Sequence, residues 1–319
     1  MVTGLSGAPA SAHDPHIRPL DAWRDGAAVA NLLELAFRDE GIDDSGQRVL
    51  HMLRHYSGAF GFVWVEDGQV VGNVSLQSNP TRRDTWVIGN VATHPARRNR
   101  GIGTALINTA VSYARAHGAR GLALQVVDGN APALRVYERI GFRALGAVAH
   151  YRRPSVRIQP PAASLGSDDG LAVRRARLAD REQVWRLTRW NVPDELTYAE
   201  PFEAGAYLLG WRWWLSNALR GNREQWFLAE RGPSILGAIR ARVNFDMAEH
   251  HVELMLGEGA DAPTGVALLS SALQRFVSYL SKPLYCVQSR PHETSQAALQ
   301  SMGFKPIRTL VHMHLALEE

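Results

Sequence analysis

The chain has 319 residues, of which 45% are hydrophobic and 21% charged, and its formal net charge is +4. This length favours two domains of about 150 residues, each with its own core. Its single cysteine, Cys286, excludes an internal disulfide, and no uncharged apolar run reaches the roughly 18 residues of a membrane helix. We therefore expect a cytoplasmic protein without a membrane partner.

The first half of the chain alternates predicted strands and helices. Residues 1–15 are small and polar and are expected to form a frayed tail, not a signal peptide. Hydrophobic periodicity then predicts, in order, a strand at 17–20, helices over 23–37 and 47–56, strands at 62–66, 69–77 and 85–92, a helix ending near 117, a strand at 121–127, a helix over 132–139 and a strand pair over 142–153. The dipeptide Asp67-Gly68 between two strands is a strong hairpin signal.

The most informative segment follows the strand at 85–92. Three arginines crowd a turn that ends in Gly101 and Gly103, where the next helix begins. Glycines let backbone N–H groups approach an anion, and the helix directs its positive dipole end to the same place. The turn lacks the lysine of a Walker loop and the third glycine of a dinucleotide fingerprint. Arginines on one turn suit a single multiply charged ligand better than a nucleic acid.

A second motif lies about thirty residues downstream, in N-x-x-A-x-x-x-Y-x-x-x-G-F. Asn130 can cap a short helix, Pro132 fits its first turn, and Gly141 can end it. Ala133 and Tyr137 are four residues apart and therefore share one face of this helix.

Together the two segments resemble the acetyl-CoA site of the GNAT superfamily of N-acetyltransferases, over about residues 15–153. The resemblance implies a mixed α/β fold, whose twisted, mostly antiparallel sheet is flanked by helices, with acetyl-CoA as cosubstrate and no metal. It implies contacts to acetyl-CoA from Val91, Ala92, Arg98, Asn99, Arg100, Gly101, Ile102, Gly103, Thr104, Asn130 and Ala133. Main-chain groups of Val91 and Ala92 would bind the pantetheine arm and polarise the acetyl carbonyl, and the amides of the turn would bind the pyrophosphate.

In the GNAT superfamily the acceptor amine attacks the thioester directly, without an acyl-enzyme. The resemblance therefore makes Tyr137 the general acid that protonates the departing thiolate, and simple packing of its ring is the alternative. Many members carry a carboxylate in a stretch such as E-N-V-x-V, and here Gly89 stands at that position. Asp84, Asp128, His94 or a water chain could supply the base, and the sequence does not choose among them.

Residues 154–170 are rich in proline, serine and glycine and indicate a linker. After it the pattern of the first half recurs at offsets of 156, 164 and 162 residues, so we expect two tandem GNAT-like domains, at 16–153 and 171–319. The second copy has an acidic loop at 257–261 in place of the arginine turn, which would repel a pyrophosphate. It is expected to be degenerate.

Other conspicuous residues receive structural interpretations. His51 and His55 lack a third metal ligand, and His250, His251, His312 and His314 are expected to face solvent on strands. Trp211 and Trp214 are expected to form the core face of a helix, with an aromatic wall for the acceptor as the alternative. Two functions stay open: an N-acetyltransferase for a primary amine of a small molecule or peptide, and a non-catalytic acetyl-CoA-binding sensor or scaffold. No nucleic-acid partner is expected, and a homodimer is left open.

Overall fold

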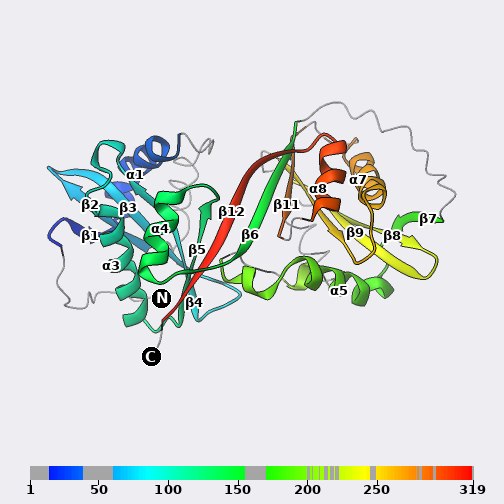
Figure 1. The fold of residues 1–319 in the computed structure, drawn as a ribbon, viewed down its shortest axis with the longest axis horizontal. Coiled ribbons are helices and arrows are strands. Elements are labelled where there is room, and N and C mark those ends of the chain that lie inside the picture. Colours follow the sequence, from blue (N-terminus) through cyan, green and yellow to red (C-terminus); the bar gives the residue numbers. More distant parts are fainter. Residues whose placement is uncertain are drawn as a thin grey trace. The chain divides into compact units, whose positions relative to one another are not determined.

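In the computed structural model the chain forms two compact units (Figure 1). The first comprises Met1–Leu145, Tyr198–Pro201 and His312–Glu319, and the second comprises Gly146–Thr197 and Phe202–Val311. The structure describes residues 14–38, 60–154, 170–199, 223–244, 249–277, 282–289 and 292–317, with residues 202, 204–207, 209–211, 215, 219 and 279 between them.

The first unit contains one mixed sheet with helices on its faces. Its elements are β1 (Ile17–Pro19), α1 (Ala22–Phe37), β2 (Phe60–Glu66), β3 (Gln69–Ser78), β4 (Thr85–Thr93), α3 (Ile102–Ala116), β5 (Gly121–Val127), α4 (Ala131–Ile140) and the end of β12 (Lys305–Ala316). The strand order is β1-β2-β3-β4-β5 followed by β12. Pairing is antiparallel from β1 to β4 and parallel between β4 and β5.

The second unit repeats this plan. Its elements are β6 (Arg143–Arg153), β7 (Leu171–Arg175), α5 (Arg181–Asn191), β8 (Arg223–Arg231), β9 (Ser234–Val243), β10 (His250–Leu256), α7 (Ala262–Phe276), β11 (Leu284–Gln288), α8 (Glu293–Ser301) and the start of β12. Strands β6-β11-β10-β9-β8-β7 lie in that order, and only β10 and β11 pair in parallel. The mixed, mostly antiparallel sheets confirm the predicted fold class. Short 3-10 turns are η2 (Pro95–Arg97), η3 (Leu178–Asp180), η4 (Asp194–Tyr198) and η5 (Ala204–Tyr207).

The last strand of each unit comes from the other half of the sequence. The expected strand pair over 142–153 is wrong, because these residues form the single strand β6, which pairs with β11 in the second unit. The first unit instead contains the end of β12, from His312 onward. The predicted domain boundaries at residues 153 and 171 stay a prediction, and they take no account of this exchange of strands.

An arginine–aspartate pair recurs at the same place in both units. Arg18 on β1 donates both Nη groups to Asp25 at 2.6 and 2.7 Å, and Arg174 on β7 does so to Asp180 at 2.8 and 3.0 Å. Each carboxylate also accepts a backbone N–H, from Asp21 and Arg177 respectively, which ties the strand to the start of the following helix. The repeated device supports an internal duplication.

Helices α1 and α3 pack on opposite faces of the first sheet. Side chains of α1 form a core with Val63 and Ala92, and α3 buries Ile102 and Leu106. An added Cβ at Gly72 on β3 would lie 2.8 Å from Ile102 Cγ2 and 2.9 Å from Leu106 Cδ1. The missing side chain therefore lets the start of α3 lie close to the sheet.

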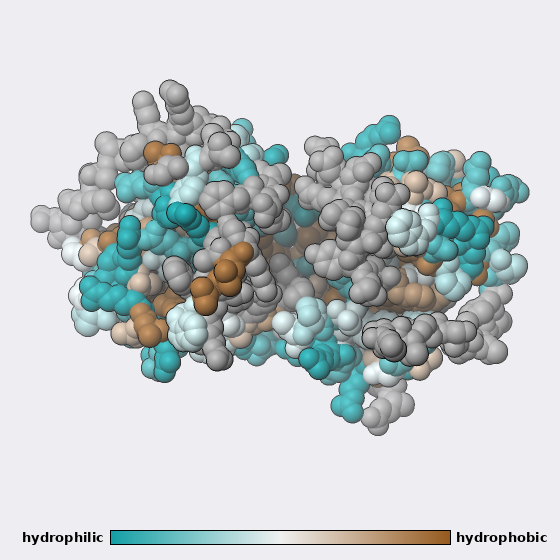
Figure 2. Space-filling model, turned by 180° about the vertical axis from the view of Figure 1, so that it is seen from behind, coloured by the Kyte–Doolittle hydropathy of each residue, from teal (hydrophilic) through white to brown (hydrophobic). Residues whose placement is uncertain are grey.

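The visible surface of the described residues is largely hydrophilic, with small separate hydrophobic spots (Figure 2). Within the described ranges, the helices are too short or too polar to cross a bilayer.

Candidate functional site

The site expected from the sequence lies where β4 leaves its neighbours. Along β3, Asn73 pairs with Ala92 and Ser75 pairs with Gly89, so β4 carries one extra residue at Asn90-Val91. Asn90 has a φ of 52°, which marks the bulge. On its other side, the parallel pairing of β4 with β5 ends at Ile88, although β4 continues to Thr93. The backbone around Val91 and Ala92 therefore pairs with no described strand along the edge that faces away from β3.

The glycine turn follows directly and leads into α3. Asn99 and Gly101 both have positive φ, at 62° and 79°, and Gly101 is the N-cap of the helix. Among the residues that the structure describes, no side chain caps α3, so the amides of its first turn, from Ile102 to Thr104, have no side-chain acceptor there. The turn is exposed, whereas the Ile102 side chain is buried. Such a helix start fits a phosphate group, because its N–H groups and its dipole act on the same point.

The three arginines of the turn contact two acceptors in the first unit. Arg97 and Arg100 both contact the Oε2 atom of Glu66, at 3.3 and 3.1 Å, and Arg98 donates to the Ala36 carbonyl at the end of α1 at 3.1 Å. Burial acts to raise the pKa of Glu66, but hydrogen bonds from Trp64 and Arg100 outweigh it and lower that pKa. The sequence analysis did not include Glu66 in the site. This residue lies just before the Asp67-Gly68 turn, and the structure places it beside Arg97 and Arg100 of the glycine turn.

Helix α4 begins at the end of β5, and its local signals behave as predicted. The side-chain oxygen of Asn130 accepts the Ala133 N–H at 3.2 Å, Pro132 lies in the first turn, and Gly141 ends the helix with φ 109°. Tyr137 is the one buried residue of α4, with 6% of its surface exposed, and its ring meets Phe142 edge-on at 5.9 Å. Because β4 and β5 are parallel, α3 and α4 begin at the same edge of the sheet.

A polar cluster that the sequence analysis missed lies beneath the bulge. Asn73 is fully buried and donates to the Asn90 carbonyl at 2.8 Å, and Asn90 donates to Ser75 Oγ at 3.3 Å. The Oδ1 atom of Asn73 is buried without a hydrogen-bond partner among the described residues. Asn73 pairs with Val63 and Ala92, so it faces α1 and not α3. The sequence did contain a signal for this cluster, because the polar residues Asn73 and Ser75 interrupt an otherwise apolar strand.

The structure separates the candidates for the general base. Asp84 precedes β4 and lies roughly 20 Å along the strand from the bulge, at the opposite edge of the sheet. His94 accepts the Ala96 N–H at Nδ1, so its neutral ring carries the proton on Nε2. Asp128 is exposed just beyond β5, at the edge where the strands separate. Gly89 has open space around it, since an added Cβ would meet no atom within 4 Å.

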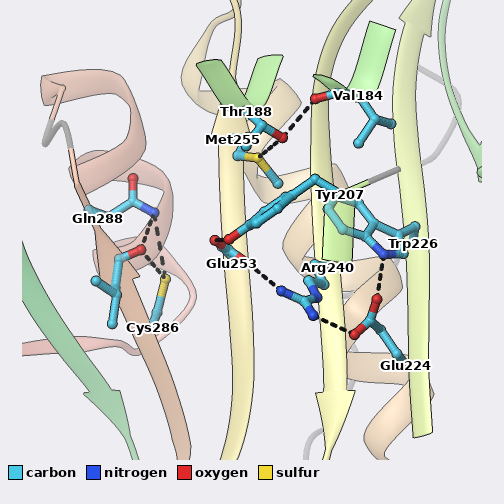
Figure 3. A network of polar contacts seen from close by, with 11 residues as sticks. Val184, Thr188, Tyr207, Glu224, Trp226, Arg240, Glu253, Met255, Cys286 and Gln288 are labelled. Carbon is cyan, nitrogen blue, oxygen red and sulfur yellow. Dashed lines mark hydrogen bonds and ion pairs between the residues drawn. The ribbon is translucent and has the colours of Figure 1, made fainter. Parts of the chain in front are cut away.

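The corresponding positions of the second unit are filled by its own side chains. Asp261 caps α7, accepting the Thr264 N–H at 2.9 Å and its hydroxyl at 2.5 Å. Pairing of β10 with β11 ends at Val252–Cys286, and beyond that point the buried Gln288 amide donates to the Leu254 carbonyl at 3.0 Å. The same amide also lies 3.6 Å from the sulfur of Cys286 (Figure 3). The bond to Leu254 spans the place where these parallel strands separate.

Several expectations outside this site are corrected. His250 and His312 are buried, not solvent-facing: His250 stacks on Phe276 and accepts the Asn244 N–H, and His312 contacts Gln125 at 3.0 Å. His251 and His314 are partly buried. Trp211 is 69% exposed, whereas Trp214, His51 and His55 lie outside the described residues. Within the described ranges, no group of three or more metal-ligating side chains converges.

Comparison with known proteins shows which family and which folds the chain resembles. Residues 27–142 match the model of the acetyltransferase (GNAT) family. An uncharacterised N-acetyltransferase of Methanocaldococcus jannaschii is 38% identical over 101 residues, which is 30% of this chain and 45% of that protein, so the chain spans less than half of that relative.

Two solved structures share the fold over nearly the whole chain. A GCN5-related N-acetyltransferase from Sphaerobacter thermophilus has a TM-score of 0.66 at 15% identity, covering 96% of this chain and 97% of that one. A tandem GNAT protein from the clavulanic acid biosynthesis pathway has a TM-score of 0.57 at 18% identity, covering 95% and 98%. Residues 27–142 therefore match the acetyltransferase (GNAT) family, and the whole chain has the fold of two GNAT-like domains in tandem.

Proposed function

We propose that the chain is an acetyl-CoA-dependent N-acetyltransferase that acetylates a primary amine of a small molecule or peptide by direct attack. Its working site would be the one in the first unit. The single buried thiol, Cys286, suits the reducing conditions of the cytoplasm.

One observation carries the proposal: within the described part of the chain the start of α3 has no side-chain cap, whereas the start of α7 is capped by Asp261. An oxyanion at α3 would take up amides that no side chain serves, and Gly101, at φ 79°, adds no side chain in its way. At α7 the same ligand would have to displace a carboxylate already bonded to Thr264. The pyrophosphate of acetyl-CoA thus fits the first unit and not the second.

The unpaired edge of β4 would hold the acyl end. Backbone groups of Val91 and Ala92 extend past the last pair with β5, so they can bond the amides of the pantetheine arm and orient the thioester carbonyl. In the second unit the Gln288 amide already uses this position. Acetyl-CoA supplies the activated acyl group, and the protein supplies position and proton transfer.

Proton transfer requires an acid near the sulfur and an acceptor near the amine. We assign the acid to Tyr137, whose phenol is a donor in its neutral form and is buried in α4. On the amine side, Asn73 Oδ1 offers a buried acceptor for an N–H, and Asp128 is the carboxylate at the correct edge of the sheet.

Replacing Tyr137 by phenylalanine tests the assignment. We expect turnover to fall by a factor of about 10²–10⁴. The affinity for acetyl-CoA, measured by calorimetry, should stay unchanged. Tyr113→Phe is a matched control, because Tyr113 is equally buried in the same unit but stacks between Phe60 and His117. An equal loss of turnover in both variants would show that Tyr137 only packs in the core and is not the general acid.

The acceptor class and the non-catalytic alternative are tested with the unchanged chain. CoA release with a panel of primary amines supports the transferase. Tight acetyl-CoA binding without turnover on any amine would instead support a sensor or scaffold, the role left open by Gly89 at the position of the family carboxylate.

A further inference from the structure

A row of polar side chains crosses three strands of the second unit. Arg242 on β9 lies opposite His251 on β10, and His251 lies opposite Tyr285 on β11. The rings of His251 and Tyr285 are 5.4 Å apart. The residues next to them in sequence, Ala241, Val252 and Cys286, belong to the core that α7 covers, so the row stands on the opposite face of the sheet.

The acidic residues on this face are already engaged by other arginines, and one of these pairs joins Glu249 to Arg152 at 2.6 Å. Arg240 contacts Glu224 at 2.6 Å and Glu253 at 3.3 Å, with its guanidinium 5.3 Å from the Tyr207 ring and 5.7 Å from the Trp226 ring (Figure 3). Glu224 lies directly opposite Arg242 in the β8–β9 pairing, yet its carboxylate turns to Arg240. Both carboxylates therefore serve one guanidinium.

Arg242 and His251 have no side-chain hydrogen bond or ion pair among the described residues, and the Nε atom of Arg242 is buried. Burial and the nearby Arg240 lower the pKa of Arg242. Burial, followed by Arg242, Arg240 and His250, lowers the pKa of His251 to about 4, so this ring is neutral at pH 7. The charges of Glu224 and Glu253 act in the opposite direction, but neither carboxylate forms an ion pair with Arg242 among the described residues. A half-buried guanidinium without a direct anionic partner is costly, and an added anion would reduce that cost.

We propose that Arg242, His251 and Tyr285 form an oxyanion-binding site, which gives the second unit a ligand of its own: the carboxylate or phosphate group of a small molecule. The planar Arg242 fork matches two oxygens of such a group, and the neutral His251 ring can donate one N–H. Tyr285, whose hydroxyl bonds to His150 Nδ1, borders the site. The site is independent of the acetyl-transfer proposal, because its residues belong to the other unit.

The test uses the full chain with inorganic phosphate and acetate as separate probes and chloride at equal ionic strength as the reference. We expect a saturable rise in melting temperature with one of the two probes. Because the start of α3 also fits a phosphate group, the probe whose effect Arg242→Gln weakens identifies phosphate or carboxylate as the ligand group of this site. In a histidine-labelled sample, the same probe should raise the pKa of His251 from about 4, because the anion offsets Arg242 and Arg240.

Arg242→Gln should weaken binding roughly ten- to hundredfold, as expected for loss of a charge-assisted hydrogen bond. Arg186→Gln is the matched control, since Arg186 is an exposed arginine of the same unit that pairs with Glu182 on α5. If Arg242→Gln does not fold, His251→Gln replaces it as the test variant. This substitution keeps an N–H donor but removes the titrating ring. No saturable effect of either probe, or equal binding by wild type and Arg242→Gln, would overturn the proposal and leave Arg242 solvated only.

Discussion

The close approach of α3 to β3 can be tested by replacing Gly72 with alanine. The new Cβ would lie 2.8 Å from Ile102 Cγ2, 2.9 Å from Leu106 Cδ1 and 3.0 Å from Trp64 Cβ, all shorter than the ordinary carbon–carbon contact of about 3.5–4.0 Å. Overpacking of this kind costs about 1–3 kcal/mol, and the stiffer unfolded chain returns about 0.4–1 kcal/mol. We therefore expect the free energy of unfolding to fall by about 1–2 kcal/mol in a urea titration.

The same variant should also weaken acetyl-CoA binding by calorimetry, because Ile102 is the first residue of α3 and anchors the glycine turn. Gly89→Ala is the matched control: it lies on the adjacent strand β4, where a Cβ meets no atom within 4 Å. We expect it to be as stable as the wild type or slightly more stable. If Gly72→Ala and Gly89→Ala unfold at the same urea concentration and bind acetyl-CoA equally, contact with β3 does not set the position of α3.

Three further predictions concern protonation and reactivity. Hydrogen bonds from Arg18 lower the pKa of buried Asp25 against the effect of burial, so the pair stabilises fully above the unfolded carboxyl pKa of about 3.9 and loses this stability as the pH falls through the lower folded pKa. Asp25→Asn should cost about 1–3 kcal/mol at pH 7 and flatten the acid limb of a stability–pH curve, and an unchanged limb would refute this. Gly89→Glu, which restores the family carboxylate in open space, should raise turnover roughly tenfold or more at neutral pH, and unchanged turnover would show that the base lies elsewhere. Burial raises the pKa of Cys286 to about 12, so a thiol reagent at pH 8 should label it only after urea is added, and rapid labelling of the folded chain would contradict its burial.

Local signals in the sequence were sufficient for much of the first unit. Asp67 and Gly68 form the predicted tight turn, both with positive φ, and Asn130 and Gly141 bound the helix that carries Tyr137. These predictions succeed because caps and turns depend on a few adjacent residues. The degeneracy of the second copy stays a prediction from its acidic loop, and the structure adds that Asp261 in this loop caps the start of α7.

The predictions that failed depend on contacts distant in sequence. An alternating strand such as β6 can pair with any suitable edge, so its pattern could not show that its partner is β11. His250 and His312 were expected to face solvent, but stacking on Phe276 and a bond to Gln125 satisfy them in the interior. The Asn73 cluster depends on a bulge in β4, where hydrophobic periodicity predicted only a continuous strand over residues 85–92.

The exchanged last strands limit how the protein can be dissected. Cutting the chain in the linker would give an N-terminal fragment that lacks residues 312–317, leaving β5 as an exposed edge, and a C-terminal fragment that lacks β6 beside β11. Bare edges of this kind recruit other chains and promote aggregation. We therefore expect neither half of the chain to fold as a stable unit alone, so the two copies have to be produced as one polypeptide.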